Sequence, residues 1–256
     1  MAIILGDDIV SDIIYDKIAK MIMSSKKTMV LTGAGLSTES GIPDFRSPGT
    51  GLWEKIDPME ALSTDVLYGN PEKFYKVGFK ILTGMKGAKP NDAHRILAKM
   101  EEEGFIDGVI TQNIDNLHYE AGSKNIMEVH GHIRTGHCVK CNKTYPFSVM
   151  EEKVNSGEIP PLCTCGSMIR PDVILFGDSL PECFNKAWRL CQQSDLLIVV
   201  GSSLQVGPVN YLPSLVKRLI IINIGETMYD RRADILCRQK ASTALKEIYS
   251  RLKKEQ

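Results

Sequence analysis

The sequence predicts an α/β fold in which a parallel sheet is covered by helices on both faces, with a smaller unit inserted into it. Four short apolar runs have the near-continuous hydrophobicity of strands that are buried on both faces. They are residues 28–32, 108–111, 195–203 and 219–225. Helical patterns stand between these runs, and two long stretches interrupt the alternation.

The predicted elements follow one another in chain order. Residues 9–23 carry apolar side chains at a spacing of three and four, which predicts an amphipathic helix with Asp12 and Lys17 turned outward. The run 28–32 (TMVLT) ends at a glycine turn, and residues 93–104 (AHRILAKMEEEG) form a second helical pattern. The charged tail 246–256 reads as the end of a last helix.

Two insertions are expected to build the smaller domain. Residues 46–90 are rich in Gly, Pro and aromatic residues and contain short helical pieces, and residues 134–171 hold four of the seven cysteines. We therefore expect these two stretches to form the small domain. The larger domain would consist of residues 1–45, 91–133 and 172–256.

The composition limits the possible classes of function. The 256 residues include 31 Lys plus Arg and 31 Asp plus Glu, so no whole-protein field favours nucleic acid or an anionic membrane. The first residues lack the basic start of a signal peptide. No apolar run approaches the roughly 20 residues of a membrane helix. We expect a cytoplasmic protein whose cysteines are metal ligands or free thiols.

The first motif is GAGLSTESGIPDFRS, which follows the strand 28–32. Gly33-Ala34-Gly35 lets the backbone turn sharply, and a helix opening there would direct its N–H groups at a pyrophosphate. Thr38 replaces the third glycine of the dinucleotide fingerprint, and no acidic ribose ligand follows about 20 residues on. An ordinary dehydrogenase therefore fits poorly.

Two further motifs carry polar residues at the ends of predicted strands. TQNIDNLH places Gln112, Asn113 and Asp115 after the strand 108–111, where open α/β sheets bind ligands. A solvated turn is the alternative interpretation. EVHG contains His130, a side chain suited to taking a proton near neutral pH, although a lone histidine is more often a packed residue.

The cysteine spacing indicates a structural zinc site. Cys138-x-x-Cys141 and Cys163-x-Cys165 form two close pairs, and four thiolates suit tetrahedral zinc. The second pair is one residue shorter than usual, and His132 and His137 are near enough to act as substitutes. Four reduced thiols without metal are the alternative.

Together these motifs resemble the sirtuin family of NAD-dependent protein deacylases, most closely its bacterial members. The matching segments occur in family order between residues 32 and 227. They are GAGLSTESGIPDFRS, TQNIDNLH, EVHG, the cysteine pairs, RPDVILFGDSL, GSSLQVGP and INIGET.

The resemblance implies a Rossmann-type parallel sheet with a smaller zinc-binding and helical domain inserted. It implies NAD as cofactor, one structural Zn²⁺, and proteins or peptides that carry acetyl-lysine as partners. Direct nucleic-acid and membrane partners are not expected. The implied activity is NAD-dependent removal of acetyl groups from lysine, which yields nicotinamide and O-acetyl-ADP-ribose.

The resemblance also implies site residues. His130 would be the catalytic base and would contact the cofactor. Val173, Phe176, Gly177 and Val206 would contact the substrate peptide, which adds as a strand. The other cofactor-binding residues would be Gly33, Ala34, Gly35, Thr38, Phe45, Arg46, Gln112, Asn113, Ile114, Asp115, Gly201, Ser202, Ser203, Asn223 and Ala241.

Other functions are possible from the residues alone. Mono-ADP-ribosyl transfer would use the same pocket with a different acceptor. A zinc-ribbon nucleic-acid module or an NAD-sensing protein would need no base, and the neutral charge and His130 argue against both. The resemblance also bears on the acyl group, because family members that prefer succinyl- or malonyl-lysine carry a Tyr-x-x-Arg pair that binds the extra carboxylate. Here Pro71 and Gly78 stand three residues after Tyr68 and Tyr75, so the resemblance implies acetyl or another uncharged acyl group.

Overall fold

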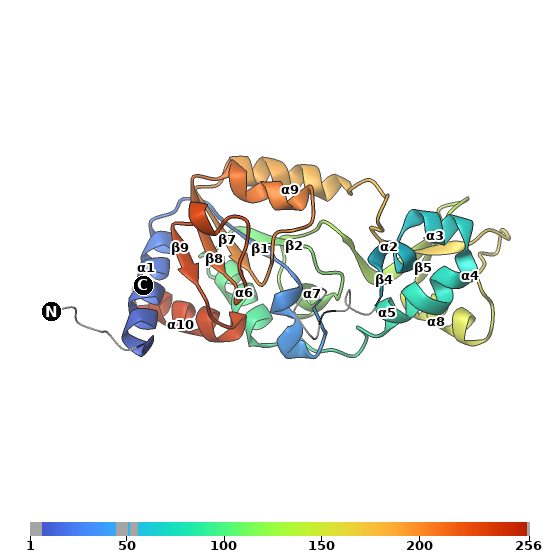
Figure 1. The fold of residues 1–256 in the computed structure, drawn as a ribbon, viewed down its shortest axis with the longest axis horizontal. Helices are drawn as coiled ribbons and strands as arrows, with labels where there is room; N and C mark the ends of the chain where they lie inside the picture. The colour runs from blue at the N-terminus through green and yellow to red at the C-terminus, as the bar shows by residue number, and fades with distance from the viewer. Residues whose placement is uncertain (1–6, 45–50, 52–55, 255–256) are drawn as a thin grey trace.

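The computed structural model describes residues 7–44, 51 and 56–254, without the side chains of residues 7–11. Its larger sheet has six parallel strands in the order β3-β2-β1-β7-β8-β9 (Figure 1). This is the order of a dinucleotide-binding Rossmann sheet, so the predicted fold class is confirmed. The strands are β1 (Thr28–Thr32), β2 (Gly108–Thr111), β3 (Ile126–Glu128), β7 (Leu196–Val200), β8 (Arg218–Ile222) and β9 (Ile235–Cys237).

The central strands form because their β-branched and leucine side chains pack on both faces of the sheet. In β1, Val30 points into one core cluster, whereas Met29 and Leu31 point into another. The first cluster lies under α1 (Asp7–Met23), α6 (Asp92–Glu102) and α10 (Ala241–Lys254). The second lies under α9 (Glu182–Gln192) and the 3₁₀ segment η5 (Val209–Leu215). The two-sided burial explains why these strands read as continuous apolar runs.

The smaller unit contains an antiparallel sheet in the order β5-β4-β6, at the other end of the molecule from α1 (Figure 1). Its strands are β4 (Gly131–Cys138), β5 (Thr144–Pro146) and β6 (Ile169–Val173). Its helices are α2 (Pro58–Ala61), α3 (Thr64–Gly69), α4 (Pro71–Lys73), the π segment η4 (Phe74–Gly78), α5 (Phe79–Thr83) and α8 (Phe147–Asn155).

Aromatic packing joins the two predicted insertions in one core. The Phe79 ring lies 5.4 Å from the Tyr75 ring and 4.9 Å from the Phe147 ring, measured between centroids. The short helices begin where side chains cap them, and Ser63 accepts from Val66 at the start of α3. Segments far apart in the sequence thus share one hydrophobic cluster.

One local expectation differs from the structure. The segment after Gly33-Ala34-Gly35 forms two 3₁₀ turns, η1 (Ala34–Leu36) and η2 (Thr38–Ser40), instead of a continuous helix. Gly41 ends the second turn at φ 83°, in the left-handed region that glycine adopts without steric cost. Residues 33–41 therefore form a compact loop at the end of β1, which we call the cofactor loop after its expected role.

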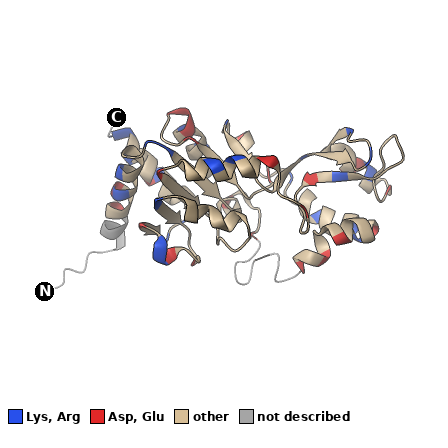
Figure 2. Cartoon of the chain, turned by 90° about the horizontal axis from the view of Figure 1, so that it is seen from above, with Lys and Arg blue, Asp and Glu red and all other residues tan. Residues whose placement is uncertain are grey.

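Charged residues of both signs are interspersed along the helices (Figure 2). Within the described part of the chain, no helix combines the length and apolar character that crossing a bilayer requires.

Candidate active site

Three glycines join the cofactor loop to the end of β7. The Gly33 N–H donates to Val200 O at 3.1 Å, and the Gly35 N–H donates to Gly201 O at 2.9 Å. A Cβ atom on Gly33 would lie 2.8 Å from Gly201 O, and one on Gly201 would lie 2.3 Å from the Leu36 nitrogen. Gly201 also has a φ of 63°. Only glycine fits where these backbones touch, and this requirement explains the Gly33-Ala34-Gly35 motif in the sequence.

The loop after β2 lies against this turn. Asn113 is buried, and its Nδ2 donates to Gly33 O and to Ser37 Oγ, each at 3.1 Å. Gln112 Nε2 donates to Ser202 Oγ at 2.8 Å. The structure thus brings Gln112, Asn113 and Ser202 together with the glycine turn, as expected for ends of neighbouring parallel strands.

Asp115 is a buried carboxylate at the centre of this group. Its Oδ2 accepts from Ser37 Oγ at 2.5 Å, and its Oδ1 accepts from the Leu117 N–H at 2.9 Å. Burial raises the pKa of Asp115, and these two hydrogen bonds act in the opposite direction. Ile114 is buried beside it, with its carbonyl bonded to the Ile133 N–H at 3.1 Å. The strand β4 therefore starts directly against this loop.

His130 precedes β4 and faces the same loop. Its Nδ1 lies 3.0 Å from Gln112 O, and since a carbonyl only accepts, Nδ1 carries the proton. Burial lowers the pKa of His130, so the ring is neutral near pH 7, although the bond to Gln112 opposes this shift. Nε2 is then the basic nitrogen.

The remaining cofactor candidates that the structure describes also lie along this edge of the sheet. Ala34 is half-buried in η1, and the exposed Thr38 donates from Oγ1 to Gly35 O at 3.0 Å. Ser203 is half-buried after β7, and Asn223 follows β8. Phe45 and Arg46 lie outside the described residues.

Ala241 is buried at the first turn of α10, beside the cofactor loop. The next residue, Ser242, donates to the Glu39 carboxylate from its N–H at 3.2 Å and from Oγ at 2.7 Å. Glu39 belongs to η2, so the start of α10 is bonded to the cofactor loop.

The predicted substrate residues lie in two places, the segment 173–177 at the end of β6 and the loop after β7. Val173 ends β6 and pairs with Gly131. Phe176 has its N–H bonded to Leu62 O and its carbonyl bonded to the Thr64 N–H, both at 2.9 Å. Its backbone is thus committed to the helical insert, and strand pairing with a peptide would have to come from neighbours such as Gly177. Val206 is half-buried in the separate loop after β7.

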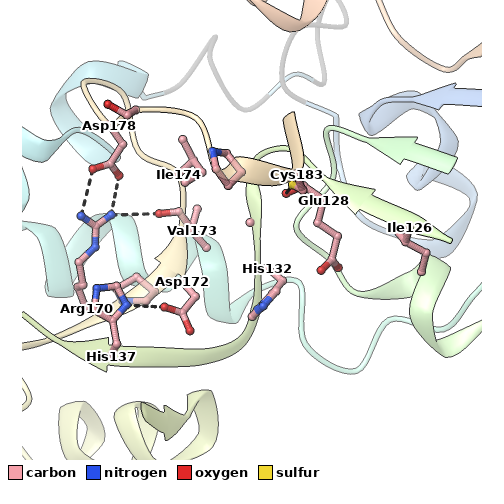
Figure 3. A pocket seen from close by; sticks show the side chains of 14 residues that line it. Ile126, Glu128, His132, His137, Arg170, Asp172, Val173, Ile174, Asp178 and Cys183 are labelled. Carbon is pink, nitrogen blue, oxygen red and sulfur yellow. Dashed lines mark hydrogen bonds and ion pairs between the residues drawn. The ribbon is translucent and has the colours of Figure 1, made fainter. Parts of the chain in front are cut away.

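A cavity of about 470 Å³ opens between β4, β6 and the start of α9 (Figure 3). Val173 lines it, whereas His130 and residues 33–41 do not. His132 and His137, the alternative zinc ligands, line it too, and His137 Nδ1 lies 2.5 Å from Asp172 Oδ1. Arg170 makes two bonds to the Asp178 carboxylate, at 3.1 and 2.5 Å, on its wall.

The four paired cysteines fit one zinc ion. The Sγ atoms of Cys138 and Cys165 are 3.4 Å apart, those of Cys141 and Cys163 are 3.6 Å apart, and all four lie within 4.8 Å of one another. The Tyr145 hydroxyl donates to Cys163 Sγ at 3.1 Å. The shortened Cys163-x-Cys165 pair thus reaches tetrahedral spacing, and thiolate donors of this kind bind structural zinc.

Sequence reasoning assigned no role in the site to four buried polar residues behind it, and it interpreted His118 as a structural residue that tolerates substitution. They are Thr32, Ser37, Thr111 and His118. A signal was present, since each of the strands β1 and β2 ends its apolar run on a threonine. A hydroxyl at the buried end of a strand needs a hydrogen-bond partner.

Comparison with known proteins gives one consistent result. The sequence profile described as the Sir2 family matches residues 33–208. A protein of Caldanaerobacter subterraneus subsp. tengcongensis named NAD-dependent protein deacetylase 2 is 61% identical over 241 residues, covering 94% of this chain and 96% of that protein. A Thermotoga maritima NAD-dependent protein deacetylase is 43% identical over 215 residues, 82% of this chain and 87% of that protein.

Solved structures agree with the sequence relatives. A Sir2 structure with a deacetylated p53 peptide and 3'-O-acetyl ADP ribose has a TM-score of 0.88 at 38% identity, covering 91% of this chain and 96% of that chain. A Sir2 structure with a p53 peptide and NAD⁺ has a TM-score of 0.84 at 39% identity, with the same coverage.

Proposed function

This chain belongs to the Sir2 family, and from that membership we propose that it is an NAD-dependent protein-lysine deacetylase. The observation that carries the proposal is His130, a neutral imidazole whose Nδ1 proton is held by Gln112 O beside the glycine turn. A nucleotide-sensing protein would not need a base at this position. The products would be the deacetylated lysine, nicotinamide and O-acetyl-ADP-ribose.

The cofactor would lie across the carboxyl edge of the large sheet. We assign its phosphates to Ala34, Thr38 and the neighbouring glycines, because the packing of Gly33 and Gly35 on the backbone of Gly201 forms a tight turn at the end of β1, where sheets of this strand order bind dinucleotides. Gln112, Asn113, Ile114 and Asp115 would hold the nicotinamide side, and Ser202, Ser203, Asn223 and Ala241 the adenosine side. When bound, NAD would supply the ribose that takes up the acetyl group, with nicotinamide as the leaving group and one water consumed as the lysine amine is released.

His130 would act at a single atom. Because the Nδ1 proton is donated to Gln112 O, Nε2 can take a proton from a ribose hydroxyl as general base. The lowered pKa keeps this nitrogen unprotonated near neutral pH. The resulting imidazolium would keep its Nδ1 hydrogen bond, which would stabilise the charge.

The substrate would be a protein segment that carries acetyl-lysine. We propose that it adds as a strand between the segment 173–177 and the loop that contains Val206. The hydrogen bonds of Phe176 to the helical insert would hold one side of this groove. We also propose the two-domain division with boundaries near residues 46–90 and 134–171, a cytoplasmic location, and no direct nucleic-acid partner.

The test combines two readouts on one acetylated peptide. The parent protein with NAD should release nicotinamide, and mass spectrometry should show that the peptide loses its acetyl group. His130→Ala should bind NAD within a few-fold of the parent but lose turnover by roughly 100- to 10,000-fold. A peptide that gains ADP-ribose would instead indicate transferase activity, and a His130→Ala protein with most of its activity would contradict the assignment.

A further inference from the structure

A chain of buried hydrogen bonds runs behind the proposed nicotinamide pocket and starts at His118 in α7 (Leu117–Glu120). His118 Nε2 lies 2.9 Å from Thr32 Oγ1. The Thr32 hydroxyl donates to Thr111 Oγ1 at 2.8 Å, and Thr111 Oγ1 also accepts the Asn113 N–H at 3.1 Å. These contacts connect α7 to the ends of β1 and β2 and to the cofactor-facing loop.

The proton positions in this chain follow from simple counting. The Thr32 hydroxyl has one proton, which it gives to Thr111, so its oxygen accepts a proton from His118 Nε2. Burial lowers the pKa of His118 well below its ordinary value, so the ring is neutral and has a single N–H. Nδ1 is buried without a hydrogen-bond partner among the described residues, as suits a bare lone pair better than an N–H group.

The loop that these hydrogen bonds hold contains one residue in the left-handed backbone region. Asn116 has a φ of 73°, in the left-handed region that residues other than glycine rarely adopt. The loop begins at Asn113, whose N–H is bonded to Thr111, and it ends at His118, which is bonded to Thr32. Since the two threonine hydroxyls are bonded to each other, both ends of the loop are held at the same point, where β1 and β2 end.

We propose that His118 is a positioning residue for the reaction: its bond to Thr32 fixes the loop that presents Asn113 and Asp115 to NAD. The inference rests on the proposed deacetylase function. Binding groups contribute fully only when neighbouring contacts hold them in place. Loss of the bond would therefore lower kcat/KM for NAD and leave the KM for the peptide almost unchanged.

A purely structural role for His118 makes a different prediction. The ring also packs against His94, with centroids 4.9 Å apart, so it contributes to the core. A role in the core alone would lower thermal stability and would affect both substrates alike. Two pairs of variants separate these roles. His118→Gln keeps a donor near the position of Nε2 and His118→Leu removes it; Thr32→Ser keeps the hydroxyl and Thr32→Val removes it at nearly constant volume.

The experiment measures initial rates of nicotinamide release with NAD and an acetylated peptide each varied, together with the melting temperature. We expect His118→Leu and Thr32→Val to lose at least about tenfold in kcat/KM for NAD, with the peptide KM within about twofold of the parent. His118→Gln and Thr32→Ser should stay within about threefold of the parent. Tyr119→Phe, at a position 62% exposed on the same helix, is the control and should match the parent.

Three results would overturn the inference: a folded Thr32→Val protein with NAD kinetics within about twofold of the parent, conservative variants as impaired as the others, or an equal rise in both KM values. If His118→Leu does not fold, Thr32→Val decides the question. A parent protein that releases no nicotinamide would refute the proposed function itself, whereas an active parent with unaffected variants would refute only the role of His118.

Discussion

Mild acid should destabilise the larger domain through His94. This residue is fully buried in α6, and burial lowers its pKa from the ordinary 6.5 to about 4, with a smaller contribution from Arg95. Because the folded state prefers the neutral ring, its full contribution to stability is present above pH 6.5. The contribution is lost as the pH falls from 6.5 toward 4. The difference between the two pKa values corresponds to a loss of about 3 kcal/mol in the free energy of unfolding, of which roughly 1 kcal/mol is lost by about pH 5.5.

The assay is calorimetric melting at about pH 7.5, 6.5 and 5.5. For a chain of this size, 1 kcal/mol shifts the melting temperature by about 2–4 °C. His118 is buried beside His94 with its pKa lowered too, so it adds to the fall in the same direction. His94→Gln should have a lower melting temperature than the parent at the highest pH, because the contacts of the ring are lost. Its melting temperature should fall less on acidification.

Zinc content is measured at each pH, so that loss of metal from the small domain is not mistaken for protonation of His94. Melting temperatures that fall in parallel for the parent and His94→Gln, with zinc retained, would refute the reasoning.

Three further predictions concern the metal, the acyl group and the glycine turn. Cys163→Ala should lose zinc and stability together by metal analysis and melting, whereas Cys191→Ala should keep about one zinc per chain; a folded, active protein without metal would contradict this. A peptide that carries acetyl-lysine should be preferred over its succinyl counterpart by at least about tenfold in kcat/KM. The Tyr75 hydroxyl is not available to a second carboxylate because it is bonded to Ile169 O, and position 78 has no room for an arginine because a Cβ on Gly78 would lie 2.1 Å from Ala61 O. Faster desuccinylation would contradict this prediction. Gly201→Ala should raise the KM for NAD in the rate assay, because its Cβ would clash with the Leu36 nitrogen, and an unchanged KM would contradict the packing.

The elements that depend on local pattern were predictable from the sequence. The central strands are continuous apolar runs because they are covered on both faces, and the glycine turn is visible because close backbone contact excludes any side chain. The cysteine pairs are visible because chelation requires short spacing. In each case the physical constraint limits which residue types can stand at neighbouring positions, so that it leaves a pattern in the sequence.

The features that depend on distant contacts were not predictable. The proton position on His130 is set by the carbonyl of Gln112, and a backbone oxygen has no sequence signature. The pairing of Phe176 with residues 62–64 joins two segments that only the folded chain brings together. The 3₁₀ turns after Gly35 replace an expected helix because the loop closes on Gly41 within a few residues. Such details need the three-dimensional arrangement.

The strand β4 has one further consequence, because the proposed base His130 and the four-cysteine cluster lie at its opposite ends. His130 immediately precedes β4, and Cys138 is its last residue. Eight residues of extended chain span roughly 25 Å. The charge of a zinc–thiolate cluster is largely screened beyond about 8 Å of exposed separation in physiological salt. The metal would thus affect the chemistry mechanically, by fixing the position of the far end of the strand, and not through its charge. Any other crosslink of equal rigidity at that end would position His130 equally well.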